Sequence, residues 1–291
     1  MTASSRPGPT FRLATRASLQ ARTQTEVVGR LLEAAYPGST AELVFVDTTG
    51  DRRQDVALHQ IGGQGVFVKE VQLAVLDGRA DLAVHSAKDL PSAPTDGLVI
   101  GGYGRRRDPR DALIGRSLAE LDEGATVATG SVRRRAQLAE LRPDLHFVEL
   151  RGNIQTRLGK VPDGGAIVMA VAALEVLGLT ERIAEAFAPE VMVPQVGQGA
   201  VAVECRADDE TVLEALRRID HGPTRRDVGI ERAFLAEIGS GCSLPVGAHV
   251  TGSTLLTYLA REEGASHHGV VALEGDDLVA VARRAANDAI G

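Results

Sequence analysis

The segment ADLAVHS, residues 80–86, is predicted to form a strand, and the elements around it decide the fold. A helix is predicted directly before it, over residues 66–77. Further upstream lie a strand over residues 41–47, a helix that Ser18 caps, and a strand over residues 11–15. Strands that alternate with helices predict a largely parallel sheet with helices on both faces.

A second alternating block follows, and the C-terminal region shows a different pattern. Four further strands are predicted at residues 125–129, 145–150, 166–171 and 200–205. Helices are predicted at residues 132–141, 154–160, 172–177 and 180–187. The C-terminal region is predicted to form a small α+β domain with an antiparallel meander, from elements at residues 225–238, 248–251, 254–261, 269–273 and 277–290.

The composition excludes several classes of protein. Of the 291 residues, 44% are hydrophobic and 24% charged, which are ordinary globular values. The net charge of −7 argues against general nucleic-acid binding, and no apolar run approaches the ~20 residues of a membrane span. Residues 1–10 lack the apolar core of a signal peptide and are expected to be disordered. The chain has only two cysteines, so we expect a cytoplasmic protein. Its histidines lack metal-ligand spacing, so we expect no metal site.

Polar and cationic side chains follow four of the predicted strands. They lie at residues 14–18, 85–89, 129–134 and 150–153. Each stretch offers a hydroxyl or amide group and a cation, and three of them open a helix, whose N-terminus favours anions. Taken singly, each is also consistent with an ordinary helix cap beside a surface arginine. Because open α/β sheets bind ligands beyond the carboxyl ends of their strands, the four together predict a cleft for a polycarboxylate or polyphosphate.

Two residues within or near this set suggest chemistry. Asp89 is a carboxylate among arginines, placed to handle a cationic group, or else the salt-bridge partner of Lys88 or an arginine. Cys242 follows small residues in the stretch GSGCSLP, residues 239–245, so its thiol has room to reach a bulky group. The alternative for Cys242 is an inert, packed thiol. The junctions carry no Walker or dinucleotide fingerprint, which disfavours a nucleotide ligand.

In order along the chain, these motifs resemble the hydroxymethylbilane synthase family, also called porphobilinogen deaminases. The similarity runs from about residue 13 to residue 249. It rests on ATRAS (14–18), GGQGVFVKE (62–70), DLAVHSAKDLP (81–91), DPRD (108–111), RR (133–134), LRGN (150–153), VGQGA (196–200) and GC (241–242).

This resemblance implies an α/β fold with two periplasmic-binding-protein-like lobes, mainly parallel sheets and a small C-terminal α+β domain. After the disordered residues 1–10, the first lobe is expected to comprise residues 11–103 and 198–220. The second lobe then comprises residues 104–197, and residues 221–291 form the domain that carries the cofactor.

The resemblance also implies an activity. The enzyme joins four porphobilinogen units head to tail into hydroxymethylbilane, releasing ammonia, on a dipyrromethane cofactor held by a thioether to Cys242. Asp89 matches the catalytic aspartate. The residues that match cofactor-binding positions are Cys242, Lys88, Asp89, Ser131, Arg133 and Arg134. Those that match substrate-binding positions are Arg16, Ser18, Arg151, Asn153 and Arg157. A monomer for tetrapyrrole and haem biosynthesis, without nucleic-acid or membrane partners, is expected.

Three departures from the family pattern leave alternatives open. Gln64 replaces a usual lysine, Gly130 a usual serine, and Val176 an arginine that contacts the cofactor. They allow a diverged paralogue with another pyrrole product, and the two-lobed cleft also suits a non-enzymatic polycarboxylate binder. Retention of both Asp89 and Cys242 favours chemistry over binding alone. The loop over residues 52–65 is predicted to be a mobile cover that excludes water from the cleft.

Overall fold

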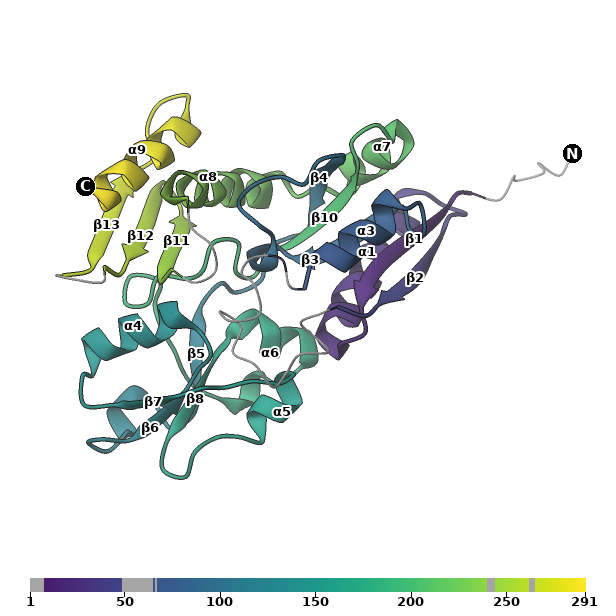
Figure 1. Cartoon of the computed structure of the whole chain (residues 1–291). Coiled ribbons are helices and arrows are strands. Elements are labelled where there is room, and N and C mark those ends of the chain that lie inside the picture. The colour runs from purple at the N-terminus through teal and green to yellow at the C-terminus, as the bar shows by residue number, and fades with distance from the viewer. Residues whose placement is uncertain (1–7, 49–64, 66, 240–243, 262–264) are drawn as a thin grey trace, which may run out of the picture.

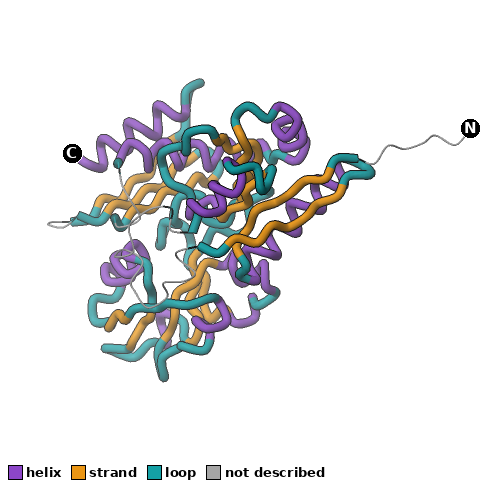
Figure 2. The backbone as a smooth tube through the Cα atoms, turned by 45° about the vertical axis from the view of Figure 1, so that its right-hand side comes forward, coloured by secondary structure: helices purple, strands orange, loops and turns teal. Residues whose placement is uncertain are grey.

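The structure contains three β-sheets, each covered by helices. It is a computed structural model that describes residues 8–48, 65, 67–239, 244–261 and 265–291. Figure 1 shows the second lobe in teal below, the first lobe in purple and blue to the right, and the C-terminal sheet in yellow-green at the upper left. Figure 2 shows the same strands as separate groups after a turn of the molecule. Two α/β lobes and a small α+β unit are therefore confirmed.

The first lobe is built on a five-stranded sheet with the order β2-β1-β3-β10-β4. Its strands are β1 (Thr10–Arg16), β2 (Thr40–Val46), β3 (Leu82–Ser86), β4 (Leu98–Tyr103) and β10 (Val201–Arg206). Helices α1 (Leu19–Ala35) and α7 (Glu210–Ile219) bury apolar side chains against one face, and α3 (Lys69–Leu76) covers the other. The predicted arrangement of helices on both faces is confirmed.

The second lobe repeats this arrangement with the strand order β7-β6-β8-β5-β9. Its strands are β5 (Asp111–Gly115), β6 (Thr126–Ala128), β7 (His146–Val148), β8 (Ala166–Ala170) and β9 (Ile183–Ala186). Helix α4 (Val132–Leu141) packs on one face, and α5 (Ile154–Leu158) and α6 (Val171–Leu177) pack on the other. The short 3-10 helices of the two lobes are η2 (Ala87–Asp89), η3 (Leu118–Glu120) and η4 (Thr180–Arg182).

The C-terminal unit is the expected antiparallel meander covered by two helices. Strands β11 (Val246–Thr251), β12 (Thr254–Leu259) and β13 (His267–Ala272) form its sheet. Helices α8 (Gly222–Ile238) and α9 (Leu278–Ile290) lie on it, and Phe234 of α8 is fully buried in their common core. The predicted positions of these five elements are confirmed to within a few residues.

Both large sheets are mixed, whereas largely parallel sheets were expected. In the first, β1 pairs in parallel with β2 and β3, whereas β10 is antiparallel to β3 and β4. In the second, β6 pairs in parallel with β7 and β8, whereas β5 is antiparallel to β8 and β9. The antiparallel half arises because the chain crosses between the lobes after β4 and returns before β10. This topology supports the domain boundaries expected above, which remain predictions.

One predicted element is wrong, and two strands and one α-helix were missed. Residues 180–187 were expected to be helical, but the structure has η4 followed by strand β9, which forms because β5, distant in sequence, offers it an edge. Strands β4 and β5 and helix α7 were not predicted. The spacing of Val212, Leu216 and Ile219 does indicate an amphipathic helix at α7.

Candidate functional site

A cavity of about 410 Å³ lies between the two lobes, at the carboxyl ends of their parallel strands. That volume suits a small organic ligand. The predicted site residues that the structure describes all line it: Arg16, Ser18, Lys88, Asp89, Ser131, Arg133, Arg134, Arg151, Asn153 and Arg157. Cys242 lies outside the described residues, as does the predicted cover except for Gly65, which lines the cavity. The tertiary structure thus brings the four predicted strand-end stretches to one place.

Three of the lining residues are helix caps. Ser18 Oγ accepts from the Ala21 amide at the start of α1, and Ser131 Oγ accepts from the Arg134 amide at the start of α4. The Asn153 Oδ1 atom accepts from the Thr156 amide at the start of α5. The helix-cap part of the simpler interpretation is therefore correct for each of them, but Arg133 and Arg134 beside Ser131 are buried and not surface arginines. A capping serine keeps its own O–H as a donor, so Ser18 and Ser131 retain a donor for a ligand.

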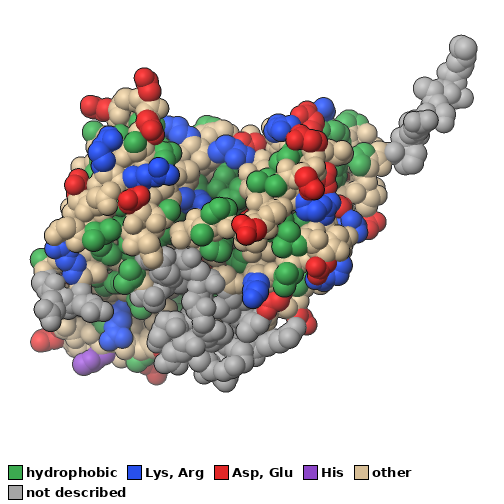
Figure 3. Space-filling view, turned by 45° about the horizontal axis from the view of Figure 1, so that its top comes forward, with side chains coloured by type: hydrophobic (Ala, Val, Ile, Leu, Met, Phe, Trp, Pro, Cys, Tyr) green, Lys and Arg blue, Asp and Glu red, His purple; other side chains and the backbone are tan. Residues whose placement is uncertain are grey.

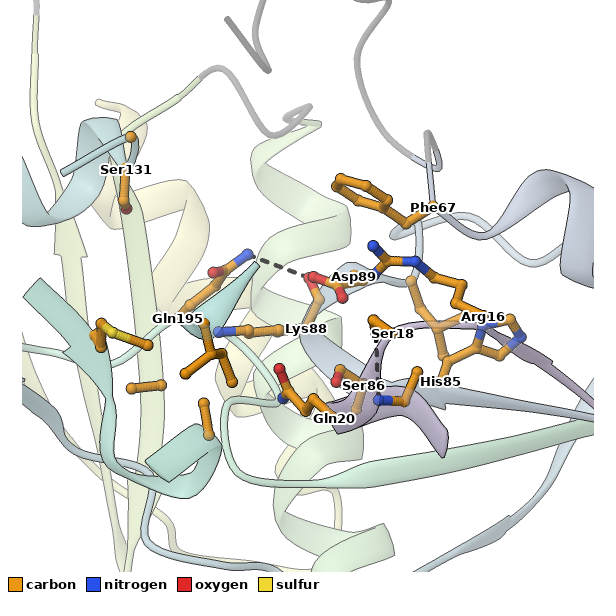
Figure 4. A pocket seen from close by; sticks show the side chains of 18 of the residues that line it. Arg16, Ser18, Gln20, Phe67, His85, Ser86, Lys88, Asp89, Ser131 and Gln195 are labelled. Carbon is orange, nitrogen blue, oxygen red and sulfur yellow. Dashed lines mark hydrogen bonds between the residues drawn. The ribbon is translucent and has the colours of Figure 1, made fainter. Parts of the chain in front are cut away.

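Lys88 and Asp89 occupy the short helix η2 at the end of β3. The Ala87 amide donates to the Ala200 carbonyl at 2.9 Å, and Gln195 Nε2 donates to the Lys88 carbonyl at 3.2 Å. In the view of Figure 4, the two side chains lie between Ser131 on one side and Arg16 with Phe67 on the other. A backbone contact from Ala200 and a side-chain contact from Gln195 thus hold the turn that carries the candidate catalytic carboxylate.

Arg16 of the first lobe and Arg157 of the second lobe also line the cavity. The Arg16 guanidinium carbon lies 4.0 Å from the centroid of the Phe67 ring, in cation–π geometry. Arg157 Nε donates to the Gly152 carbonyl at 2.8 Å. Gly152 has a φ of +114°, and a Cβ there would lie 2.7 Å from the Thr156 side chain, so this turn requires glycine.

Arg133 and Arg134 share a buried carboxylate that the sequence analysis did not single out. Asp111, which opens β5, is fully buried. Its Oδ2 lies 2.7 Å from Arg133 Nη2, and its Oδ1 accepts from Arg134 Nε at 2.8 Å. Burial alone would raise the pKa of Asp111, but the two guanidinium charges outweigh it and lower the pKa to about 2. The sequence did carry a signal for Asp111, because an acidic residue stands there at the start of an apolar stretch.

Arg133 still has hydrogen-bonding capacity. Its Nη1 donates to the Val193 carbonyl at 2.7 Å, but its Nε and Nη2 lack a hydrogen-bond acceptor among the described residues. The Nη2 contact to Asp111 is a short ion pair without hydrogen-bond geometry.

The charge in the cavity is strongly positive. Burial lowers the pKa of Lys88 to about 8, and the positive charge of Arg134 acts in the same direction. Burial likewise lowers the pKa of Arg157 to about 10, with Arg134 and Arg151 adding to the effect. Cations that disfavour one another's charge in this way are stabilised by an incoming anion.

The departures from the family pattern have different structural settings. A Cβ at Gly130 would lie 2.8 Å from Glu149 Oε1 and 2.9 Å from the Leu150 carbonyl, so the close approach of that segment explains the glycine. Val176 lies on α6, where Ala173 and Leu177 line the cavity. Gln64 lies outside the described residues.

On the face shown in Figure 3, the Lys and Arg side chains are interspersed with Asp and Glu. Among the described residues, no helix is long and apolar enough to span a bilayer, and no group of three or more His, Cys, Asp or Glu is placed to hold a metal ion.

The matching family model and the curated relatives agree with one another. Residues 11–214 match the family model described as "Porphobilinogen deaminase, dipyromethane cofactor binding domain". The porphobilinogen deaminase of Roseiflexus sp. (strain RS-1) is 49% identical over 254 residues, which cover 85% of this chain and 84% of that protein. The porphobilinogen deaminase of Acidothermus cellulolyticus is 50% identical over 256 residues, covering 84% and 77%. Among solved structures, the methionine binding protein MetQ matches 75% of this chain and 92% of its own, with a TM-score of 0.48 and 15% identity.

Proposed function

The chain belongs to the porphobilinogen deaminase family, and we propose that it joins four porphobilinogen units into hydroxymethylbilane on a dipyrromethane held in the cleft. It is accordingly a transferase. The observation that carries the proposal is the convergence of Asp89 with the cationic residues of both lobes around one cavity. We further propose that it is a cytoplasmic monomer that acts in tetrapyrrole biosynthesis.

The cavity residues fit a dipyrromethane. Each pyrrole of that group carries two carboxylates, and Lys88, Arg16 and Arg157 offer charged donors around the cavity. We propose Cys242 as the point of covalent attachment. When bound, the dipyrromethane supplies the pyrrole carbon to which the first substrate is joined.

Asp89 is proposed as the catalytic residue. When the aminomethyl C–N bond of porphobilinogen breaks, ammonia leaves and the pyrrole becomes cationic. A carboxylate beside that pyrrole stabilises the cation and accepts the proton released once the new C–C bond has formed. The arginines and Lys88 are suited to the substrate carboxylates, which leaves Asp89 as the anionic group among these side chains.

The first test is the mass of the intact protein. Purified from cells that make porphobilinogen, the wild-type protein should exceed its sequence mass by one dipyrromethane unit and should convert porphobilinogen to hydroxymethylbilane. Cys242→Ser should remove the excess mass and the activity. Cys205→Ser is the matched control, because the Cys205 thiol is buried in the first lobe, and it should keep both. An unmodified wild-type mass together with no turnover would contradict the proposal.

Binding of substrate should depend on pH through Lys88. Because burial and Arg134 hold the pKa of Lys88 at about 8, the empty site loses this charge as pH rises above 8. A bound carboxylate raises that pKa, so binding takes up a proton, and affinity should fall by up to about tenfold per pH unit above pH 8. Calorimetry of porphobilinogen with the Cys242→Ser protein, in buffers of different ionisation enthalpy, measures this uptake at pH 8.5.

Lys88→Arg provides the control for that titration, because arginine stays charged throughout this pH range. Proton uptake at pH 8.5 should be smaller in this variant than in the protein that retains Lys88. Equal uptake by the two proteins would show that another group titrates.

A further inference from the structure

A buried glutamine lies between the two lobes beside the cavity. Gln198, in the loop before β10, is fully buried. Its Nε2 donates to the Pro109 carbonyl at 2.7 Å and to Asp111 Oδ1 at 2.9 Å. Its Oε1 accepts from Lys88 Nζ and from Arg134 Nη2, each at 3.4 Å. The side chain thus contacts Lys88 of the first lobe and the Arg134–Asp111 ion pair of the second.

These partners fix the orientation of the amide. An ammonium and a guanidinium have only donors, and a carboxylate and a carbonyl have only acceptors. Turning the amide over would place its NH₂ against Lys88 and Arg134, and its oxygen against Asp111. The Gln198 side chain is therefore a neutral spacer that separates two cations from each other while it contacts both.

The backbone holds Gln198 in this position. Its carbonyl accepts from Arg106 Nε at 2.9 Å. The preceding Gly197 has a φ of +70°, and a Cβ there would lie 3.1 Å from the Ala87 Cβ and 3.3 Å from the Lys88 nitrogen. The Gly197 amide donates to the buried Glu231 of α8 at 2.8 Å. The loop is thus held against the Lys88 turn by contacts from several elements.

We propose that Gln198 is a positioning residue that couples Lys88 to the Arg134–Asp111 pair, and so sets the relative placement of the carboxylate-binding groups on the two sides of the cleft. The inference rests on the proposed function, since it assigns those groups to ligand carboxylates. If Gln198 served the fold alone, its substitution would change the free energy of unfolding without changing the titration midpoint of Lys88. The groups that act electrostatically on Lys88 are Arg133 and Arg134 on α4, Asp89 on its own turn and Asp111 on β5.

The titration of Lys88 separates these two roles. The chain has only three lysines, Lys69, Lys88 and Lys160, so a protein labelled with ¹³C at lysine Cε gives three resonances. Lys69→Arg and Lys160→Arg assign the other two. The measurement uses the full-length Cys242→Ser protein, with and without Gln198→Met, which keeps the side-chain length but removes its hydrogen bonds.

Loss of the Gln198 acceptor disfavours the ammonium, so the Lys88 midpoint should fall by about 0.5–1 pH unit in Gln198→Met. Gln198→Glu should raise it, because a carboxylate favours the ammonium. In the enzyme that keeps Cys242, the alkaline limb of the pH–rate profile should move in the same directions. Gln137→Met is the matched control: Gln137 is also buried and bonds the Val193 backbone, and its loss should leave the Lys88 midpoint unchanged.

An unchanged Lys88 midpoint in folded Gln198→Met or Gln198→Glu protein would overturn the inference and leave Gln198 with a structural role alone. The same would follow if Gln137→Met shifted the midpoint as much as Gln198→Met. The Lys88 titrations do not require the protein to turn over porphobilinogen. A wild-type protein that neither carries the dipyrromethane mass nor consumes porphobilinogen would overturn the proposed function while the titration still reports on Gln198.

Discussion

Asp89→Asn should lower the turnover of porphobilinogen by about 10²–10⁴-fold. The change keeps the shape of the side chain but removes the negative charge that is proposed to stabilise the cationic pyrrole and to accept its proton. The dipyrromethane should remain attached, because neither Cys242 nor the cationic donors are altered. Steady-state turnover and intact mass, measured on the same preparation, test both statements.

Two further variants show whether this effect is specific. Asp96→Asn, in an exposed loop of the same lobe, should turn over at the wild-type rate. Arg16→Leu should weaken substrate binding, because it removes a cation from the cavity wall. Wild-type turnover by Asp89→Asn would show that Asp89 is not catalytic, and would favour the non-enzymatic or alternative-product interpretation.

Asp111→Asn should destabilise the fold by about 3–5 kcal/mol. Asp111 balances the buried charges of Arg133 and Arg134, and removal of one member of a buried ion pair leaves the others uncompensated. Urea unfolding of the cofactor-free Cys242→Ser protein, with and without the change, measures the loss. Asp144→Asn is the matched control in the same lobe. The Asp144–Arg142 pair is partly exposed to solvent, so its loss should destabilise the fold much less than the loss of Asp111.

The pH dependence of stability tests separately whether the pKa of Asp111 is lowered in the fold. A carboxyl whose pKa is lowered to about 2 in the fold stabilises the protein above its ordinary pKa of about 4, and this contribution disappears as pH falls towards 2. The stability difference between the Cys242→Ser protein and its Asp111→Asn derivative should therefore shrink between pH 4 and pH 2. A difference that stays constant over this range would show that the fold does not lower the pKa of Asp111.

Much of the fold and the site could be predicted because the relevant signals are local. Ser18 and Ser131 stand directly before helical runs, and each caps the helix that its position predicted. The apolar run at β8 and the spacing in α1 predicted their elements in the same way. Because the carboxyl ends of parallel strands meet at one edge of a sheet, Arg16 and Lys88 could be expected at one cavity.

The sequence by itself therefore determined the alternation of elements, the helix caps and the set of cationic residues at the strand ends. Only the tertiary structure decided how these residues are paired. Strand β9 forms because β5 offers it an edge. Asp111 reaches Arg133 and Arg134 across the second lobe, and Gln198 reaches Lys88 from a segment 110 residues away. Burial and neighbouring charge, which set the pKa of Lys88, depend on groups that only the folded chain brings together.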